Sequence, residues 1–260
     1  MARCGRYIAI LFALASATAL AGCKQSSSSL DSSSDLSTAS TSVPVSYEAT
    51  AELSKKWESD PKNVSKGLAY ANALESIGQS KKQLEVYRKL VALNPANTKL
   101  ASLYGRKLVS IGRSNEAVPV LERAAQSGDA DWRTHSALGS AYDQQGLYQK
   151  ARAEYQKALT LDPQNLSVQN NMGMSFALEG DLKQAETTLR QADAIPRSKT
   201  EPRIRQNLAL VVGLQGRFDE ASKLASEDLP AEQVQENMAY LQKMLSQPNT
   251  WQQISEGASG

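Results

Sequence analysis

The stretch WRTHSALGSAYDQQGLYQKARAEYQKALTLDPQN, residues 132–165, decides the fold. Gly139 and Ala151 have small side chains, so two antiparallel helices that carry them can approach closely. Gly146 lies between them and can adopt the left-handed conformation that ends a helix. Pro163 cannot continue a helix interior, so it marks the start of the next pair. The stretch therefore predicts one compact pair of antiparallel helices.

The same pattern recurs along the chain. Glycines in the helix-ending position stand at Gly78, Gly112, Gly146, Gly180 and Gly216, with spacings of 34, 34, 34 and 36 residues. This period, together with Leu138-Gly139, Tyr142, Tyr155 and Ala158, resembles the tetratricopeptide-repeat (TPR) family over about 200 residues. Because no single helix pair buries its apolar face alone, several repeats must stack.

The resemblance implies an all-α fold, a superhelical solenoid of antiparallel helix pairs with a C-terminal capping helix. The array is expected over residues 46–245, with repeats at 64–97, 98–131, 132–165, 166–201 and 202–235. Residues 47–58 are expected to form a helix before the first repeat, and 231–245 carry one apolar helical stripe that predicts the cap. A two-residue insertion predicts a longer loop near 196–201, and residues 246–260 are expected to be a flexible tail.

Composition and charge exclude several classes of protein. The 260 residues hold 29 Lys and Arg against 27 Asp and Glu, whereas a nucleic-acid binder normally needs a basic face. Two cysteines and one histidine exclude most zinc sites, disulfide frameworks and HExxH proteases. His135 falls at a helix-packing position, where a packed histidine is expected rather than a catalytic base. The sequence predicts a non-enzymatic protein without cofactor, metal, nucleic acid or small-molecule substrate.

Residues 1–22 have the pattern of a secretory signal. Basic residues precede an apolar segment from Tyr7 to Leu20, which is shorter than the roughly 20 residues that a membrane span needs. It ends in Leu20-Ala21-Gly22-Cys23, which resembles the bacterial lipoprotein signal. The resemblance implies that the Cys23 thiol takes a diacylglyceryl group. The alternative is an ordinary signal peptide with a chance cysteine.

The residues after Cys23 suggest a location and a tether. Lys24 stands where an Asp tends to retain lipoproteins in the inner membrane of enteric-type bacteria, so lipid anchoring in the outer membrane, facing the periplasm, is expected. Residues 23–45 are rich in serine and poor in large apolar side chains, which predicts a flexible tether between anchor and array.

The TPR resemblance also implies a concave face that binds protein segments, lined by fixed positions of each repeat's first helix. On this register the candidate groove residues are Lys99, Arg106, Arg133, Ser140, Asp143, Gln144, Asn170, Met174, Leu178, Arg203, Gln206, Leu210 and Leu214. The cations suit acidic groups, and the methionine and leucines suit an apolar anchor. The alternative is that the charges are merely solvated and that helix 231–245 covers the apolar end.

A narrower resemblance lies near the C-terminus. Asp228-Leu229-Pro230, Ala239-Tyr240-Leu241 and Asn249-Thr250-Trp251 are similar to the end of the TadD lipoproteins, TPR proteins of the Tad system that assembles Flp pili for adhesion. This implies a scaffold that assists localisation or assembly of the secretin, with secretin or other Tad pilus-assembly proteins as partners. Two alternatives stay open: an adaptor for periplasmic cell-wall hydrolases, and a periplasmic enzyme with an unrecognised site.

Overall fold

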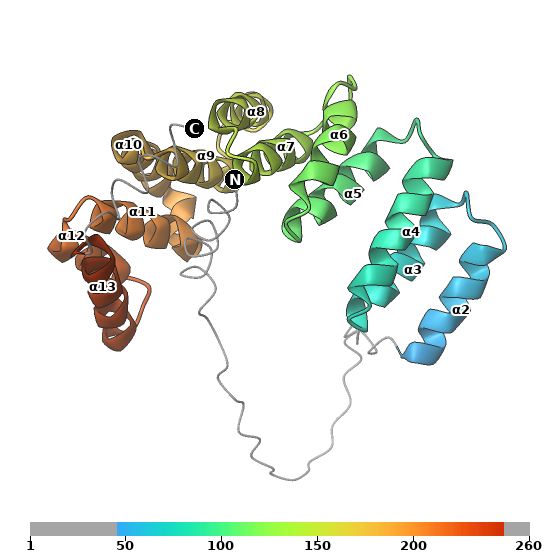
Figure 1. Ribbon diagram of the computed structural model, residues 1–260, viewed down its shortest axis with the longest axis horizontal. Helices are drawn as coiled ribbons and strands as arrows, with labels where there is room; N and C mark the ends of the chain where they lie inside the picture. The colour runs from blue at the N-terminus through green and yellow to red at the C-terminus, as the bar shows by residue number, and fades with distance from the viewer. Residues whose placement is uncertain (1–45, 247–260) are drawn as a thin grey trace, which may run out of the picture. The chain divides into compact units, whose positions relative to one another are not determined.

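The computed structural model describes residues 46–246, and this part of the chain is all-helical (Figure 1). It contains no strand, and its elements are α2 (Tyr47–Glu58), α3 (Val64–Ser76), α4 (Ser80–Leu93), α5 (Thr98–Ser110), α6 (Ser114–Ala125), α7 (Trp132–Gln144), α8 (Tyr148–Leu161), α9 (Leu166–Glu179), α10 (Leu182–Asp193), the 3-10 helix η1 (Pro196–Thr200), α11 (Pro202–Leu214), α12 (Phe218–Ala225) and α13 (Ala231–Ser246). The predicted signal, Cys23, the tether 23–45 and the tail after Ser246 lie outside the described residues.

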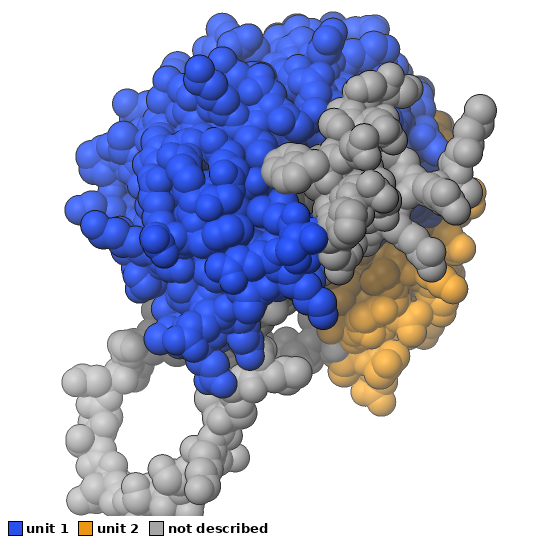
Figure 2. Space-filling model, turned by 60° about the vertical axis from the view of Figure 1, so that its left-hand side comes forward, with its two compact units in different colours: residues 1–15, 95–260 blue, residues 16–94 orange. Residues whose placement is uncertain are grey.

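The helices divide into two compact units, whose described parts are residues 46–94 and 95–246 (Figure 2). In the unit of residues 46–94, α3 pairs with α4, and α2 packs on α3. Trp57 on α2 is buried, lies 5.8 Å from the Tyr70 ring between centroids, and donates its indole N–H to the Pro61 carbonyl at 3.1 Å. The expected helix over 47–58 is therefore present, and an aromatic contact holds it on the first repeat.

In the unit of residues 95–246, four helix pairs follow one another: α5 with α6, α7 with α8, α9 with α10, and α11 with α12. The second helix of each pair also packs on the first helix of the next, and α13 packs on α12 and α11 in the same manner. The all-α TPR solenoid predicted from the sequence is confirmed. No helix in residues 46–246 is both long and apolar enough to cross a membrane.

The first helix of a repeat needs a small residue at the point where the second helix packs closely against it. A Cβ placed on Gly139 would lie 2.7 Å from the Tyr155 ring and 3.0 Å from the Ala151 carbonyl oxygen. Gly105 and Gly173 approach Leu121 and Leu189 in the same way. Any side chain at these positions would force the two helices apart, since packed interiors hold few voids. The close approach inferred for Gly139 and Ala151 is therefore present.

Side-chain caps define where the first helices begin. Asn97, Asp131 and Asn165 each accept a hydrogen bond from the backbone N–H three residues later, at 2.9 to 3.1 Å. Such caps stabilise a helix by about 1 kcal/mol each. Gly146, with φ of +72°, follows the end of α7 in the left-handed conformation predicted for it. The first helices α5, α7 and α9 thus have start signals in their own sequence, whereas α11 begins at Pro202 without a side-chain cap.

The fourth repeat departs from the prediction of a loop near 196–201. These residues form the 3-10 helix η1, whose Ser198 is buried and donates its hydroxyl to the Asp193 carbonyl at 2.6 Å. The two-residue insertion is taken up by this extra turn, since a tight helix satisfies the backbone groups that a loop would expose to solvent.

The cap expected over 231–245 is α13. A Cβ on Gly213 of α11 would meet Leu241 of α13 at 2.7 Å, which shows how closely the two helices pack. The buried guanidinium of Arg205 donates two hydrogen bonds to Asp228, at 2.8 and 2.6 Å, just before α13 begins. An apolar contact and a buried ion pair therefore both hold the last helix.

Candidate functional site

The first helices of the unit 95–246 form one continuous surface, here named the inner face. Helices α5, α7, α9 and α11 contact one another in sequence, whereas no comparable contact joins the second helices α6, α8, α10 and α12 in this described unit. On the outer side, long side chains bridge the wider gap: Arg190 of α10 pairs with Glu220 of α12, and Arg217 pairs with Glu186. The closer spacing of the first helices makes their side the concave one.

Polar side chains join successive first helices across the inner face. Thr134 of α7 donates its one hydroxyl hydrogen to Asp131. Its oxygen therefore accepts the hydrogen bond from Ser102 of α5, at 2.7 Å. Farther along, Asn207 of α11 donates to the buried Asn170 of α9 at 2.8 Å. These groups are satisfied within the protein, and Asn170, one of the predicted groove residues, holds two repeats together.

Asp143 is the most buried charge among the predicted groove residues. Its carboxylate accepts hydrogen bonds from Tyr155 of α8 at 2.8 Å and from Ser175 of α9 at 2.6 Å. Burial raises the pKa of Asp143 from 3.8 to about 6, although both hydrogen bonds and the nearby Arg152 lower it. Ser140 in turn donates to the Tyr155 hydroxyl at 3.1 Å. Asp143 and Ser140 therefore bind α7 to its neighbours.

Three of the four candidate cations of the inner face lie at its N-terminal end, on α5 and α7, and Arg203 lies on α11. Lys99, Arg133 and the more distant Arg203 are exposed. Arg133 lies over the Trp132 ring at 4.5 Å from its centroid and is 3.4 Å from the Asp131 carboxylate. Arg106 of α5 is half-buried, and its Nε has no hydrogen-bond partner within the described protein. This Nε atom is itself shielded from solvent, so a ligand at the inner face would meet the exposed part of the Arg106 side chain rather than its Nε.

A second unused group lies on α7 nearby in the fold. Gln144 donates its amide to the Val109 carbonyl of α5 at 2.9 Å, and Val109 is three residues, about one helical turn, after Arg106. The Gln144 Oε1 atom is buried without a partner in the described protein. The junction of α5 and α7 therefore contains an unpaired donor and an unpaired acceptor, both of them shielded from solvent.

Fewer apolar side chains are accessible at the C-terminal end of the inner face than the sequence predicted. Met174 and Leu210 are half-buried against a core cluster that also contains Val234, Met238 and Leu241 of α13. Leu214 is buried in this cluster, at 7 % exposure. Leu214 therefore packs in the core beside the cap helix instead of facing a ligand, because α13 completes the hydrophobic face that α11 leaves open.

The remaining candidates at this end are partly accessible. Leu178 and Gln206 are half-buried. A small pocket of ≈ 20 Å³ lies beside Asn170 and Arg203, between the starts of α9 and α11. A volume of this size holds about one water molecule and no side chain. This part of the inner face offers an open surface rather than a deep cavity.

His135 is a packing residue, as predicted. It is buried, and its Nδ1 lies 2.8 Å from the Glu154 carboxylate of α8, which also binds Lys157 at 2.7 Å. Within residues 46–246, no group of three or more His, Cys, Asp or Glu side chains is placed to hold a metal ion.

Comparison with known proteins agrees with this architecture. The family model "Tetratricopeptide repeat" matches residues 105–165. MamA residues 41–end from Desulfovibrio magneticus RS-1 is 26 % identical, with a TM-score of 0.53 over 58 % of this chain and 85 % of that chain. The chain has a TPR fold. TPR proteins of this kind are interaction scaffolds, so the fold points to protein partners.

Two further solved structures share the fold at lower identity. PilW, described as a widely conserved type IV pilus biogenesis factor, is 21 % identical, with a TM-score of 0.60 over 76 % of this chain and 90 % of that chain. YrrB, described as a TPR protein with an unusual peptide-binding site, is 18 % identical, with a TM-score of 0.53 over 75 % of this chain and all 100 % of that chain. No curated protein matches the chain.

Proposed function

We propose that this TPR protein is a non-catalytic scaffold of Tad/Flp pilus assembly, anchored in the outer membrane through Cys23 and assisting secretin localisation or assembly. The C-terminal resemblance to TadD supports the Tad assignment, and the fold shared with a pilus biogenesis factor is consistent with it. The observation that carries the scaffold role is the continuous inner face of α5, α7, α9 and α11, whose N-terminal end carries the side chains of Lys99, Arg106 and Arg133.

The partner segment is proposed to be acidic. Lys99, Arg106 and Arg133 give the N-terminal end of the inner face a positive charge, which attracts carboxylates and steers association. Arg106 is the anchoring cation, because its half-buried side chain is already partly ordered by its surroundings. Met174 and Leu210 supply adaptable apolar contacts farther along the same face.

Charge reversal at Arg106 and Arg133 tests this assignment. The double variant Arg106→Glu/Arg133→Glu should capture at least about tenfold less secretin from the cell envelope, since attraction to an acidic segment becomes repulsion. The measurement is quantitative crosslinked co-purification with the full-length protein. The matched control is Arg123→Glu/Lys183→Glu, which changes the net charge equally at exposed positions on the second helices α6 and α10.

The control variant should capture secretin like the parent protein. Equal loss in both variants would mean that only overall charge matters, and unchanged capture by the inner-face variant would remove this face from the contact. Recovery of cell-wall hydrolases without secretin would move the protein to the hydrolase-adaptor function.

A further inference from the structure

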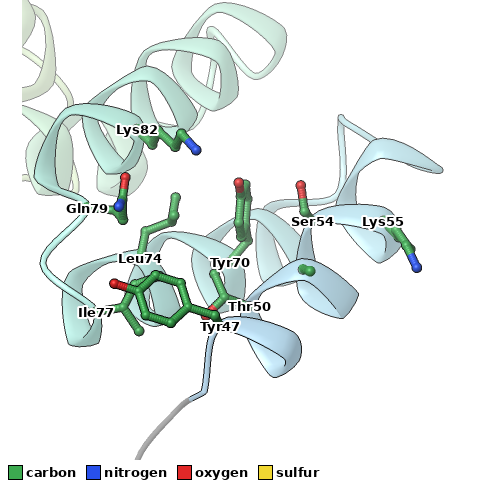
Figure 3. A pocket seen from close by; sticks show the side chains of 10 residues that line it. Tyr47, Thr50, Ser54, Lys55, Tyr70, Leu74, Ile77, Gln79 and Lys82 are labelled. Carbon is green, nitrogen blue, oxygen red and sulfur yellow. The ribbon is translucent and has the colours of Figure 1, made fainter.

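The unit of residues 46–94 contains an open pocket, whose lining comes from α2, α3 and the start of α4 (Figure 3). Its volume is ≈ 370 Å³, within the range of about 300–1,000 Å³ that is typical of ligand sites. All its lining residues belong to this unit, so the pocket is separate from the inner face of residues 95–246.

Aromatic and aliphatic side chains form one side of the pocket. Leu74 is only 2 % exposed and forms its base, and the Tyr70 ring is held in place by its contact with the buried Trp57. Tyr47 lies beside Ile77 and is 70 % exposed (Figure 3). A large aromatic ring left open to solvent beside a cavity is typical of binding surfaces, where tyrosine contributes apolar area at small entropic cost.

The charges that line the pocket are all positive. Among residues 46–94, its charged lining residues are Lys55 and Lys82, and no Asp or Glu of that range lines it. Lys55 pairs with Glu52 at 3.1 Å, whereas Lys82 forms no ion pair within residues 46–246. Lys82 lies in the first turn of α4, which has no side-chain cap and no acidic residue at its start, so the helix dipole adds to the positive potential.

We propose that this pocket binds an acidic peptide segment of a partner protein. A large apolar side chain of the segment enters between Tyr47, Tyr70 and Leu74, and a neighbouring carboxylate pairs with Lys82. The apolar base of the pocket matches the apolar side chain of the segment, and the cations at its edge match the carboxylate. Gln79 at the edge offers both an amide donor and an acceptor for the peptide backbone.

The test uses the full-length protein and two synthetic octapeptides. One is Gly-Ser-Asp-Phe-Glu-Leu-Ser-Gly, and the other carries Lys in place of Asp and Glu. Isothermal titration should detect binding of the acidic peptide only. Lys82→Glu should weaken this binding by about tenfold, because attraction becomes repulsion. Ala51→Trp, at an exposed lining position, should abolish binding at this pocket by filling it.

Two controls separate this site from other effects. Lys62→Glu changes the charge of the same unit at an exposed position outside the pocket lining and should leave binding unchanged. Because the inner face is itself proposed to bind an acidic segment, the titrations are repeated in the Arg106→Glu/Arg133→Glu background, where the effects of Lys82→Glu, Ala51→Trp and Lys62→Glu report on the pocket alone. Circular dichroism of each variant confirms that the helices remain folded.

Three outcomes would overturn the proposal. Equal binding of both peptides would show that no charge selection occurs. Absence of binding would show that the pocket does not accept this chemistry, whether it stays empty or the chain's own residues 24–45 fill it. Conversion of a dimer to a monomer by Ala51→Trp, seen in sedimentation, would identify a second copy of the chain as the occupant.

Discussion

At the scale of single residues, Asp143 couples the packing of three helices to pH. Burial raises the pKa of this carboxyl to about 6 in the folded protein, whereas the ordinary value is 3.8. The folded state therefore holds the proton more tightly than the unfolded chain does. The free energy of unfolding should fall as the pH rises from about 4 to about 6, by on the order of 3 kcal/mol in total. Above about pH 6 this whole contribution to the free energy of unfolding has been lost.

Asp143→Asn should remove this pH dependence. The amide stays neutral, can accept from Ser175 and can donate to the Tyr155 hydroxyl, which can then donate to Ser140. Urea unfolding between pH 4 and pH 7 should show a flatter profile for the variant and a higher stability than the parent near pH 7. Asp219→Asn, at an exposed position, is the control and should keep the parent profile. An unchanged slope in Asp143→Asn would mean that another group titrates in this window.

At the scale of elements, a buried ion pair fixes the position of the cap helix α13. The Arg205 side chain is 10 % exposed and that of Asp228 is 8 % exposed, and Asp193 and Glu227 also lie within 4 Å of the guanidinium, at 3.7 and 3.4 Å. Hydrogen bonding to Asp228 raises the pKa of Arg205 above its already high value, so the pair stays charged. Removing the cation would leave three carboxylates close together without compensation.

Arg205→Met should therefore loosen α13 more than the rest of the array. The loss is about 3 kcal/mol, in the range found when one partner of a buried ion pair is removed. Hydrogen exchange should become faster in α13 and in the turn before it, while α5 and α7 keep their protection. Arg217→Met removes an exposed cation from the outer side and should change exchange little. Uniform acceleration over the whole array would contradict a local role.

At the scale of the whole molecule, the proposed lipid anchor determines where the array can act. Cys23→Ala should release the protein from membranes, because firm anchoring requires the acyl chains that the thiol would carry. Fractionation of the cell envelope measures this, and Cys4→Ala is the control, since Cys4 lies inside the predicted signal and would be lost on processing. Retention of Cys23→Ala in the membrane fraction of cells without the pilus proteins would contradict the lipoprotein assignment.

Most of the fold followed from the sequence because each repeat carries its own local signals. Asn97, Asp131 and Asn165 begin first helices, and the glycine at position 146 follows the end of one. The η1 helix did not follow, since an inserted pair of residues gives length but no periodicity. Local signals report the start, end and buried stripe of a helix, and these are the features on which a TPR array depends.

The candidate sites were less accessible to sequence reasoning. The register placed Arg106 and Arg133 on the inner face, but it could not separate them from Asp143 and Asn170, which also fall at groove positions and bond to neighbouring helices. The pocket at Tyr47 and Tyr70 was missed altogether. Its signal, two tyrosines on neighbouring helices with a lysine after them, has no periodicity and becomes a site only when α2 and α3 pack.

The sequence by itself determined the repeat length, the helix pairs and the small residues that let the helices approach, because these depend on contacts between the two helices of one repeat. Only the tertiary structure decided which polar side chains are already paired. Asp143 and Ser175 are 32 residues apart and lie on different repeats, so their hydrogen bond depends on the rotation and spacing of two packed helices. Those same packing angles leave the buried Arg106 Nε without a partner and bury Leu214 in the core cluster to which α13 contributes.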